Sequence, residues 1–460
     1  MDEDFYMQKD PEHEAEDILA LLTDKKPGQI KAFFAELHPA DISEIICSEV
    51  FEDKQRTVLF RLLSKDTAAE VFVELDSKIR ETIIQSFNDS ELHSMLDELF
   101  IDDTVDIIEE MPANVVRRII RNSTPEAREM INKILEYPSD SAGSIMTPEY
   151  ISLNKDMTVS DAFIHIRHTG LDSETVYTCY VTDDKKTLIG VVTVRELLLA
   201  PPESLVGDIM NTNIVFVGTT TDKEDVAKQF SKYGFLAFPV VDKEQRLVGI
   251  ITVDDAIDVI QEEATEDFSK MAAVVPIEES YFSASVFKHA KNRLLWLVIL
   301  MVSATITGAI ISHYQEAFAL YPLLIACLPM LMDTGGNCGS QTSTMVIRGM
   351  AIDEMTPKDM LKVWFKEIRI ALLVGLALAV INFGRVLLIY GADQVSLGIT
   401  TSLALTFTVC LAQTLGCVLP MAAKACKLDP AIMASPLITT IVDALSVTVF
   451  FSIAVVIFNI

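Results

Sequence analysis

Apolar residues recur at helical spacing through the first third of the chain, from about residue 15 to residue 137. Short breaks such as His38-Pro39 and Met111-Pro112 interrupt the pattern, and each segment between breaks has one apolar stripe and acidic remaining faces. This spacing is typical of short amphipathic helices that pack through one face. Residues 1–137 are therefore predicted to form an acidic all-α domain, arranged as a superhelix of helix pairs.

Polar residues that favour helix N-termini stand ahead of several of these apolar runs. Asp41 precedes Ile42, Asp66 precedes the segment TAAEVFVEL, and Thr124 precedes Pro125. Because a side-chain oxygen can accept a hydrogen bond from the free N–H groups of a first helical turn, we expect these three residues to be N-caps.

The periodicity changes after the turn-rich segment from Tyr137 to Gly143, where short apolar strands begin to alternate with helices. Ile145-Met146 recurs as Ile209-Met210, and LIGVVTVRELL recurs 59 residues later as LVGIITVDDAI. Tandem copies of this kind indicate two similar α/β modules that pack against each other. We place the first module at residues 138–202 and the second at residues 203–268.

Each copy carries a Thr followed three residues later by an acid, Thr193 with Glu196 and Thr252 with Asp255. A Thr hydroxyl beside the free N–H groups of a helix N-terminus suits an anion, but it can equally cap its own helix. The repeated strand, turn and Thr-x-x-acid pattern resembles tandem cystathionine-β-synthase (CBS) domains. That resemblance implies that an adenosine nucleotide such as ATP binds between the modules, with these four residues near its ribose and phosphates.

An acidic helix is predicted after the second module, in the sequence QEEATEDFSKMA. Spacings of three and four place Glu263, Glu266 and Asp267 on one face, where like charges repel unless a cation or a basic partner is present. A solvated acidic face is the alternative. The segment that follows, residues 269–293, ends in YFSASVFKHAKNR, which predicts an amphipathic connecting helix at the cytoplasmic membrane surface.

The last part of the chain, residues 294–460, holds five apolar segments near or above the length that spans roughly 30 Å of hydrocarbon. They lie around residues 294–311, 321–347, 368–390, 397–419 and 431–458. Lys and Arg gather in the second-to-third and fourth-to-fifth connections and are absent from the other two. By the positive-inside rule, the N-terminal domains are cytoplasmic and the C-terminus lies outside the cell.

The fifth apolar segment contains a single ionisable side chain, Asp443. A carboxylate near the centre of a spanning helix costs roughly 2.5–3.5 kcal/mol on insertion scales, so such residues usually face a bundle interior or a water-filled path. Asp443 is therefore a candidate cation ligand. The alternative is a protonated carboxyl that is hydrogen-bonded to a neighbouring helix.

The second apolar segment contains PMLMDTGGNCGSQ, residues 329–341. We expect its three glycines to let the backbone leave the regular helix and to free carbonyl groups. Together with Asn337, Ser340 and Gln341, these carbonyls are hard oxygen ligands that suit a small hydrated cation. The alternative is that the small residues only allow another helix to cross closely.

Negative charge is concentrated before Leu294. That part of the chain holds 57 of the 66 acidic residues and 29 of the 37 basic residues. An acidic surface repels nucleic acid and attracts cations, so we expect divalent cations as partners and no nucleic acid. The seven cysteines show no metal-binding spacing, which is typical of a reducing cytosol.

The order of these parts resembles the MgtE family of magnesium channels, with GGN-x-G-x-Q in the second apolar segment and PL-x-TT-x-x-D in the fifth. The resemblance implies a homodimer in the lipid of the plasma membrane, with an Mg²⁺ pore between the two membrane halves. It also implies a multidomain fold: an all-α superhelical domain, tandem α/β CBS domains, a connecting plug helix and a five-helix transmembrane domain. Asp443, Gly336 and Ser340 would line the pore, and Asn337 lies among them.

The same resemblance implies that cytosolic Mg²⁺ closes the pore. It assigns Glu263, Glu266 and Asp267 to magnesium sensing, and it adds Asp255 and Asp102, which would share ions across a domain interface. The segment before Leu294 would be the plug that lies against the pore.

Two other functions stay open from the residues alone. Asp333-Thr334-Gly335 resembles the DTG motif of aspartic proteases, and Asp443 could supply the second carboxylate of an intramembrane protease. The CBS pair could instead belong to a membrane-tethered nucleotide sensor that transports nothing. The main interpretation is a transport protein with no enzymatic activity.

Overall fold

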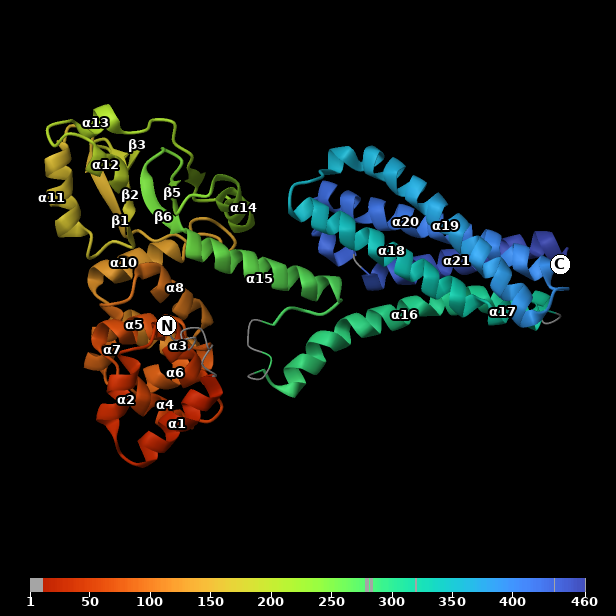
Figure 1. Ribbon diagram of the computed structural model, residues 1–460, viewed down its shortest axis with the longest axis horizontal. Coiled ribbons are helices and arrows are strands. Elements are labelled where there is room, and N and C mark those ends of the chain that lie inside the picture. The colour runs from red at the N-terminus through yellow and green to blue at the C-terminus, as the bar shows by residue number, and fades with distance from the viewer. Residues whose placement is uncertain (1–10, 278–280, 282–283, 319–320, 434, 460) are drawn as a thin grey trace, which may run out of the picture. The chain divides into compact units, whose positions relative to one another are not determined.

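The computed structural model of the chain describes residues 11–277, 281, 284–318, 321–433 and 435–459 (Figure 1). The chain divides into two compact units, Met1–Gln261 and Glu262–Ile460. The first unit holds an α-helical domain and two α/β modules, and the second consists of long helices. Each unit is described by itself.

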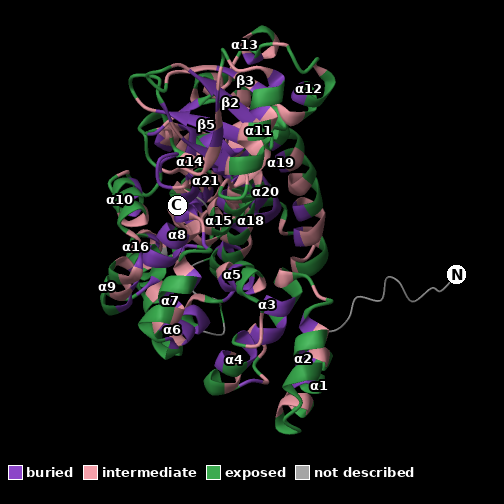
Figure 2. Cartoon of the chain, turned by 90° about the vertical axis from the view of Figure 1, so that its left-hand side faces the viewer, coloured by how far each residue is buried: buried purple, intermediate pink, exposed green. Residues whose placement is uncertain are grey.

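The N-terminal domain consists of short helices throughout its described residues. They are α1 (Pro11–Thr23), α2 (Pro27–Phe34), α3 (Pro39–Cys47), α4 (Asp53–Phe60), α5 (Lys65–Val73), α6 (Ser77–Ser86), α7 (Asp89–Leu96), α8 (Ile101–Glu110), α9 (Ala113–Asn122) and α10 (Pro125–Ile134). Each helix buries one stripe and exposes the opposite face, as the purple and green sides of the helices in Figure 2 show. The predicted all-α domain is confirmed.

The helix starts in this domain confirm one of the three predicted caps. Thr124 caps α10, because its hydroxyl accepts a backbone N–H of the first turn at 3.1 Å. The predictions for Asp41 and Asp66 are wrong, since both lie inside the first turns of helices that begin at Pro39 and Lys65. At α3 the cause is the proline, which is favoured at the first helical position and starts the helix earlier.

The two α/β modules have the same topology. The first sheet contains β1 (Tyr150–Asn154), β2 (Thr175–Thr182) and β3 (Leu188–Thr193), and the second contains β4 (Val217–Gly218), β5 (Ala237–Val241) and β6 (Leu247–Thr252). The helices are α11 (Val159–Thr169), α12 (Val194–Leu199), α13 (Val206–Ile209) and α14 (Lys223–Tyr233). In each sheet the first strand pairs in parallel with the second, and the second pairs antiparallel with the third. The predicted internal repeat is confirmed.

The segment that opens each module packs on the sheet of the other module. Met146 lies against Gly249 of β6, and Met210 lies against Gly190 of β3. Thr147 also exchanges two backbone hydrogen bonds with β6, at 2.8 and 2.9 Å. The repeated Ile-Met pair therefore joins the modules, because each methionine covers a strand position that has no side chain.

One hydrophobic core joins the N-terminal domain to the second module. Phe238 and Ile251 of the second sheet are buried in the same cluster as Ile108 and Ile134 of the helical domain. The first module has a separate core around Val181. The helical domain and the second module are therefore held together by apolar burial, which is the largest favourable term in folding.

The second unit is a bundle of long helices. After α15 (Val253–Met271), which begins in the first unit, they are α16 (Val286–Phe318), α17 (Pro322–Ala326), α18 (Leu328–Ala351), α19 (Met360–Tyr390), α20 (Val395–Ala425) and α21 (Ser435–Phe458), with short 3₁₀ turns η2 (Pro357–Asp359) and η3 (Pro430–Met433). Among the described residues, α16, α19, α20 and α21 are long and apolar enough to cross a membrane. Helices α18 to α21 lie side by side, with α20 in contact with the other three (Figure 1).

Residues 269–293, which were predicted as one connecting helix, do not form a single helix. α15 ends at Met271, and α16 begins at Val286 and continues without interruption into the first apolar segment. No Pro or Gly occurs from Val286 to Leu294, so the helix propagates across the expected boundary. Residues 278–280 and 282–283 of the predicted helix lie outside the described residues.

Replacing Gly249 by Ala tests the packing between the modules. A Cβ there would lie 2.8 Å from both Met146 Sδ and the Thr147 carbonyl oxygen, and a backbone oxygen cannot rotate away. We expect a loss of about 1–3 kcal/mol of stability, as for other overpacked positions, measured as a lower midpoint of thermal unfolding. Gly28→Ala is the matched control, since a Cβ in α2 meets no atom within 4 Å. Equal midpoints for the two variants would contradict the packing.

Candidate functional site

Buried and half-buried carboxylates gather in the first unit, where α8 meets the α/β modules. Asp102 and Asp103 belong to the first turn of α8, and Asp255 belongs to the first turn of α15. Glu149 and Glu174 stand directly before β1 and β2. The groups are close enough to act on one another's ionisation. The structure thus brings Asp102 and Asp255 together as predicted, and it adds three carboxylates that the sequence analysis missed.

Burial and mutual repulsion raise the pKa of these carboxyl groups. Burial, followed by the charge of Asp255, raises the pKa of Asp102 well above its ordinary value. The same two causes raise the pKa of Asp103 to about 7, while burial and Asp103 raise the pKa of Glu174 to about 8. Burial raises the pKa of Asp255 to about 6, against the opposing hydrogen bonds from Thr252. A cation bound nearby would favour the ionised forms.

Hydrogen bonds satisfy this cluster only in part. Glu149 Oε2 accepts the backbone N–H of Ile101 at 2.9 Å, at the N-terminus of α8. Glu174 Oε2 is buried and has no hydrogen-bond partner in the part of the chain that the structure describes. Within those same residues, no three His, Cys, Asp or Glu side chains are arranged so that they could hold a metal ion. A complete cation shell would therefore need further oxygens, from water, from the backbone or from a second copy of the chain.

The Thr-x-x-acid pair of each module closes on itself. Thr193 Oγ1 accepts the N–H of Glu196 at 3.2 Å, and Glu196 Oε2 accepts the N–H of Thr193 at 2.7 Å. In the second module, Thr252 donates both its hydroxyl and its backbone N–H to Asp255 Oδ2. The capping alternative is confirmed for Thr193 with Glu196, whereas the second pair shows the hydrogen bonds to Asp255 Oδ2 alone. Nucleotide binding by these four residues stays a prediction.

The acidic end of α15 has a basic partner. Glu263, Glu266 and Asp267 are half-buried, in agreement with the predicted common face. Lys270 Nζ lies 2.7 Å from Glu266 Oε1 and 2.6 Å from Asp429 Oδ2. Burial acts to lower the pKa of Lys270, but the two carboxylates outweigh it and raise that pKa above its ordinary value. The fixed ammonium therefore offsets part of the negative charge of this face.

The Lys270 bridge connects α15 to the segment that leads into α21. Asp429 lies between α20 and α21, and its Oδ1 accepts the N–H of Ala431 at 2.8 Å at the start of η3. Ser343 of α18 donates its hydroxyl to the carbonyl of Met433 at 3.2 Å. Asp429 thus joins η3 to the end of α15, and η3 is also bonded to α18. Sequence spacing could have found the pair of Lys270 with Glu266, but nothing in the local sequence indicates Asp429.

α18 is a regular helix, so the predicted interruption at its glycines is wrong. The backbone carbonyls of these residues accept hydrogen bonds within the helix and are not freed as ligands. The break in this apolar segment lies earlier, at Cys327 between α17 and α18. The sequence analysis overestimated the effect of glycine, because tertiary packing stabilises the helix at these positions.

The glycines of α18 allow close helix crossings instead. A Cβ on Gly335 would lie 2.7 Å from Thr408 Cγ2 of α20 and 2.8 Å from Val442 Cγ1 of α21. A Cβ on Gly336 would lie 2.8 Å from Thr439 Cγ2 of α21. The small-residue alternative is confirmed, and α20 and α21 approach the α18 backbone on this side.

The opposite side of α18 is exposed and polar. Spacings of four, four, three and four residues define a stripe, called here the polar stripe of α18. It consists of Asp333, Asn337, Gln341, Thr344 and Arg348, all of them exposed. The exposed residues of α19 between 370 and 389 are all apolar, which suits contact with lipid. A polar stripe in hydrocarbon must face protein or water, since lipid satisfies no hydrogen bond.

Asp443 lies beside this crossing. It is half-buried in α21, one turn after the Thr439 that contacts Gly336, and its Oδ1 is buried with no hydrogen-bond partner among the described residues. The Asp333 carboxylate is close enough to interact with it electrostatically. Ser340 is half-buried next to the polar stripe. The predicted pore residues thus lie on the two helices that cross at the glycines.

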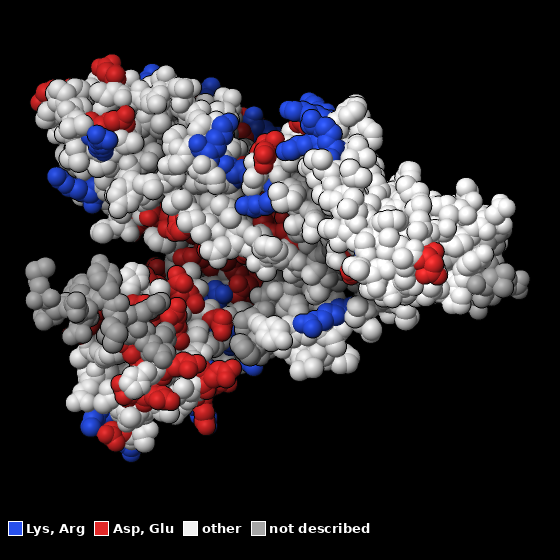
Figure 3. All heavy atoms as spheres, turned by 45° about the vertical axis from the view of Figure 1, so that its right-hand side comes forward, with Lys and Arg blue, Asp and Glu red and all other residues white. Residues whose placement is uncertain are grey.

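Figure 3 shows how unevenly charge is distributed between the units. Acidic side chains gather over part of the visible surface of the first unit, whereas the long helices of the second show a face almost without charge. Lys and Arg gather at one end of the bundle. Lys358, Lys362 and Lys366 lie where α19 begins, and the positive-inside rule associates such a cluster with the cytoplasmic side of a membrane.

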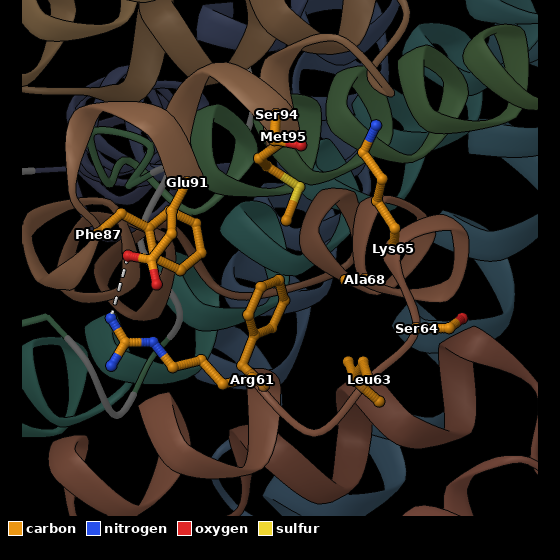
Figure 4. A pocket seen from close by; sticks show the side chains of 10 residues that line it. Arg61, Leu63, Ser64, Lys65, Ala68, Phe87, Glu91, Ser94 and Met95 are labelled. Carbon is orange, nitrogen blue, oxygen red and sulfur yellow. Dashed lines mark hydrogen bonds and ion pairs between the residues drawn. The ribbon is translucent and has the colours of Figure 1, made fainter.

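A separate pocket of about 200 Å³ lies in the N-terminal domain (Figure 4). Its lining is Phe60, Arg61, Leu63, Ser64, Lys65, Ala68, Phe87, Glu91, Ser94 and Met95. Its two basic residues are paired with acids: Arg61 Nη2 lies 3.3 Å from Glu91 Oε2, and Lys65 pairs with Glu98. It contains none of the predicted site residues.

Three families of known proteins match this chain. Residues 328–453 match a divalent cation transporter family, MgtE; residues 37–140 match the MgtE intracellular N domain; and residues 142–203 and 206–262 match CBS domains. The magnesium transporter MgtE of Thermus thermophilus is 34% identical over 429 residues, which are 92% of this chain and 94% of that protein. The chain belongs to the MgtE family.

Other MgtE proteins agree with this assignment. The magnesium transporter MgtE of Bacillus subtilis is 30% identical over 437 residues, covering 95% of this chain and 96% of the relative. The crystal structure of the cytosolic domain of the Mg²⁺ channel MgtE in complex with ATP is similar with a TM-score of 0.50 at 34% identity, over 53% of this chain and 99% of that one. The soluble part of a magnesium transporter is similar with a TM-score of 0.51 at 29% identity, over 55% and 100%. The predicted family and fold class are confirmed.

The carboxylates of the cluster around Asp102 make the stability of the first unit depend on pH when divalent cations are removed. Their pKa values are raised in the folded chain, so their favourable contribution is complete below about pH 4 and is lost as the pH rises through about 6 to 8. We expect the midpoint of thermal unfolding in a chelating buffer to fall across that range. Asp102→Asn should flatten the decline, and the exposed Asp184→Asn should not. A decline of equal slope in all three proteins would contradict the role of this cluster.

Proposed function

We propose that the chain is a magnesium channel or transporter of the plasma membrane, which carries Mg²⁺ into the cell and closes when cytosolic Mg²⁺ binds its soluble domains. The observation that carries the proposal is the polar stripe of α18 beside Asp443, in a bundle whose other helices expose apolar side chains. Two relatives whose alignments cover more than nine-tenths of this chain are named magnesium transporters.

The chemistry of the stripe suits a hydrated divalent cation. Mg²⁺ holds an octahedral shell of oxygen atoms at roughly 2.0–2.1 Å and gives up water reluctantly. Asp443 supplies negative charge, while Asn337 and Ser340 supply polar groups that bond to the ion's water molecules. Gly336 contributes by letting α21 approach α18, which places Asp443 beside the path.

A second copy of the chain completes the path. The polar stripe of one copy needs a polar surface opposite it, and a twofold axis supplies the same stripe from the partner. Two Asp443 carboxylates would then face the axis, and a doubly negative ring favours divalent over monovalent cations. The homodimer with its pore at the subunit interface follows from this requirement.

The cytosolic carboxylates supply the gate. When internal Mg²⁺ is scarce, neighbouring carboxylates repel one another in two places. One is the cluster around Asp102 and Asp255, and the other is the α15 face of Glu263, Glu266 and Asp267. Bound Mg²⁺ neutralises them and stabilises one arrangement of the domains. The Lys270 bridge connects the acidic face to Asp429, which stands directly before η3 and accepts a hydrogen bond from it, and α21 with its Asp443 follows in the chain.

ATP at the CBS pair and the membrane orientation are part of the proposal. A relative's cytosolic domain was crystallised with ATP, and a Thr that caps its helix leaves the remaining N–H groups of that terminus available to phosphate. Thr193, Glu196, Thr252 and Asp255 are the expected contacts. The charge of the connections supports cytoplasmic N-terminal domains and an external C-terminus.

Asp443→Asn removes one charge with little change in shape. We expect Mg²⁺ uptake into liposomes to fall at least about tenfold, because each 1.4 kcal/mol of lost ion stabilisation is a factor of ten. Asp353→Asn is the matched control, since Asp353 is exposed in a connection and has a positive φ of 55° that Asn tolerates. Uptake by Asp443→Asn at the level of the control would rule out this pore assignment.

Lys270→Gln tests the bridge between α15 and η3. Without the ammonium, Glu266 and Asp429 repel each other when internal Mg²⁺ is low, so we expect uptake under that condition to change by about two- to fivefold, in the direction of a more open pore. At high internal Mg²⁺ a divalent cation can replace the lysine, so the difference should disappear.

The control for this variant is Lys228→Gln, which removes a similar pair, 2.8 Å from Glu224 in α14. It should match the wild type at every internal Mg²⁺ concentration. If Lys270→Gln behaves in the same way, the bridge takes no part in gating.

A further inference from the structure

Asp333 opens the polar stripe of α18 and has no role in the pore described so far. It lies five residues after the start of the helix and is exposed on the same face as Asn337 and Gln341. In the orientation that the connections predict, this end of α18 is external. Asp333 therefore stands at the outer entrance of the proposed path, before the ion reaches Asn337.

The charge of Asp333 is not balanced within the described residues. Within those residues, the Asp333 carboxylate interacts with the carboxylate of Asp443. Both groups are negative when ionised, so this interaction is repulsive. Two other charged residues of the spanning helices have polar partners: Glu367 accepts the Thr342 hydroxyl at 3.1 Å, and Arg385 donates to Asn382 at 2.9 Å. Two carboxylates that repel each other at membrane depth are unfavourable unless a cation is present.

A second observation points to the same place. Asp443 Oδ1, on the carboxylate that interacts with Asp333, is buried and has no hydrogen-bond partner among the described residues. Buried oxygen atoms without a donor are costly in a membrane bundle, and a hydrated cation supplies donors through its water molecules.

We propose that Asp333 is a second cation-recruiting carboxylate, which concentrates hydrated divalent cations at the outer entrance and passes them to Asp443. This inference rests on the proposed magnesium transport and extends it to the step of ion entry. In a dimer, two copies of Asp333 would add a second negative ring outside the ring of Asp443. Such a ring raises the local concentration of a divalent cation, and the effect weakens as salt screens it.

The test is Mg²⁺ uptake into liposomes at varied external Mg²⁺, at low and at high ionic strength. For Asp333→Asn we expect the half-saturating Mg²⁺ concentration to rise about tenfold at low salt and much less at high salt, with maximal uptake retained. Asp333→Glu keeps the charge and should stay near the wild type. Asp393→Asn removes an exposed carboxylate from the connection between α19 and α20 and should change nothing.

Inhibition by hexaamminecobalt(III), an inert mimic of hydrated Mg²⁺, gives a second readout from the outside. Its half-inhibiting concentration should rise about tenfold in Asp333→Asn and remain unchanged in Asp393→Asn. An unchanged half-saturating concentration in Asp333→Asn, or a rise of equal size at both ionic strengths, would overturn the inference. Failure of the proposed function is separate, since the wild-type protein would then show no Mg²⁺ uptake at all.

Discussion

Carboxylates shielded from water without enough positive charge are the constraint that both units share. In the first unit, Asp102, Asp103 and Glu174 are forced toward protonation by burial and by one another. In the second, Asp443 has a buried oxygen with no hydrogen-bond partner in the part of the chain that the structure describes, and a like charge as its neighbour. Each arrangement stores electrostatic free energy that a divalent cation can release. The same physics thus supplies both an ion path and a sensor of the ion that passes through it.

The close packing of α18 is what makes the unfavourable charge tolerable. Its glycine side brings α20 and α21 to the backbone, which leaves the polar stripe as the side that must meet water or a partner. A bulkier residue at Gly335 or Gly336 would separate the helices and let Asp443 turn elsewhere. The glycines and the carboxylate therefore depend on each other, although they lie on different helices.

Much of the fold could be predicted from sequence because it depends on local periodicity. The helical domain, the repeated modules and the apolar segments follow from patterns of 3.6 and 2 residues, whereas the structure was needed to show that the repeated Ile-Met pair makes the contact between modules. The regular course of α18 could not be predicted, because packing by Thr408 and Val442 outweighs the weak helix propensity of glycine. Nor could Glu149, Glu174 or Asp429, since only tertiary contacts bring them to their partners.

The pairing of Asp102 with Asp255 could be predicted only from the resemblance to the MgtE family. Their separation in sequence is more than a hundred residues, so no spacing rule pairs them, and the family likeness did so before the structure placed them together. The opposite case is Lys270. It lies one turn after Glu266 in the predicted helix, so the spacing of four residues is enough to indicate this ion pair from the sequence.

The length of α15 gives the bridge at its end a mechanical consequence. The helix is continuous for 19 residues, from the edge of β6 to the turn that holds Lys270, which at 1.5 Å per residue is about 28 Å. A rigid rod of that length behaves as a lever, so a tilt of about 5° at its first turn moves the last turn by about 2.5 Å. A displacement of that size is comparable to the diameter of a water molecule, so a small rotation where Asp255 sits can become a step as large as one hydration layer at the far end.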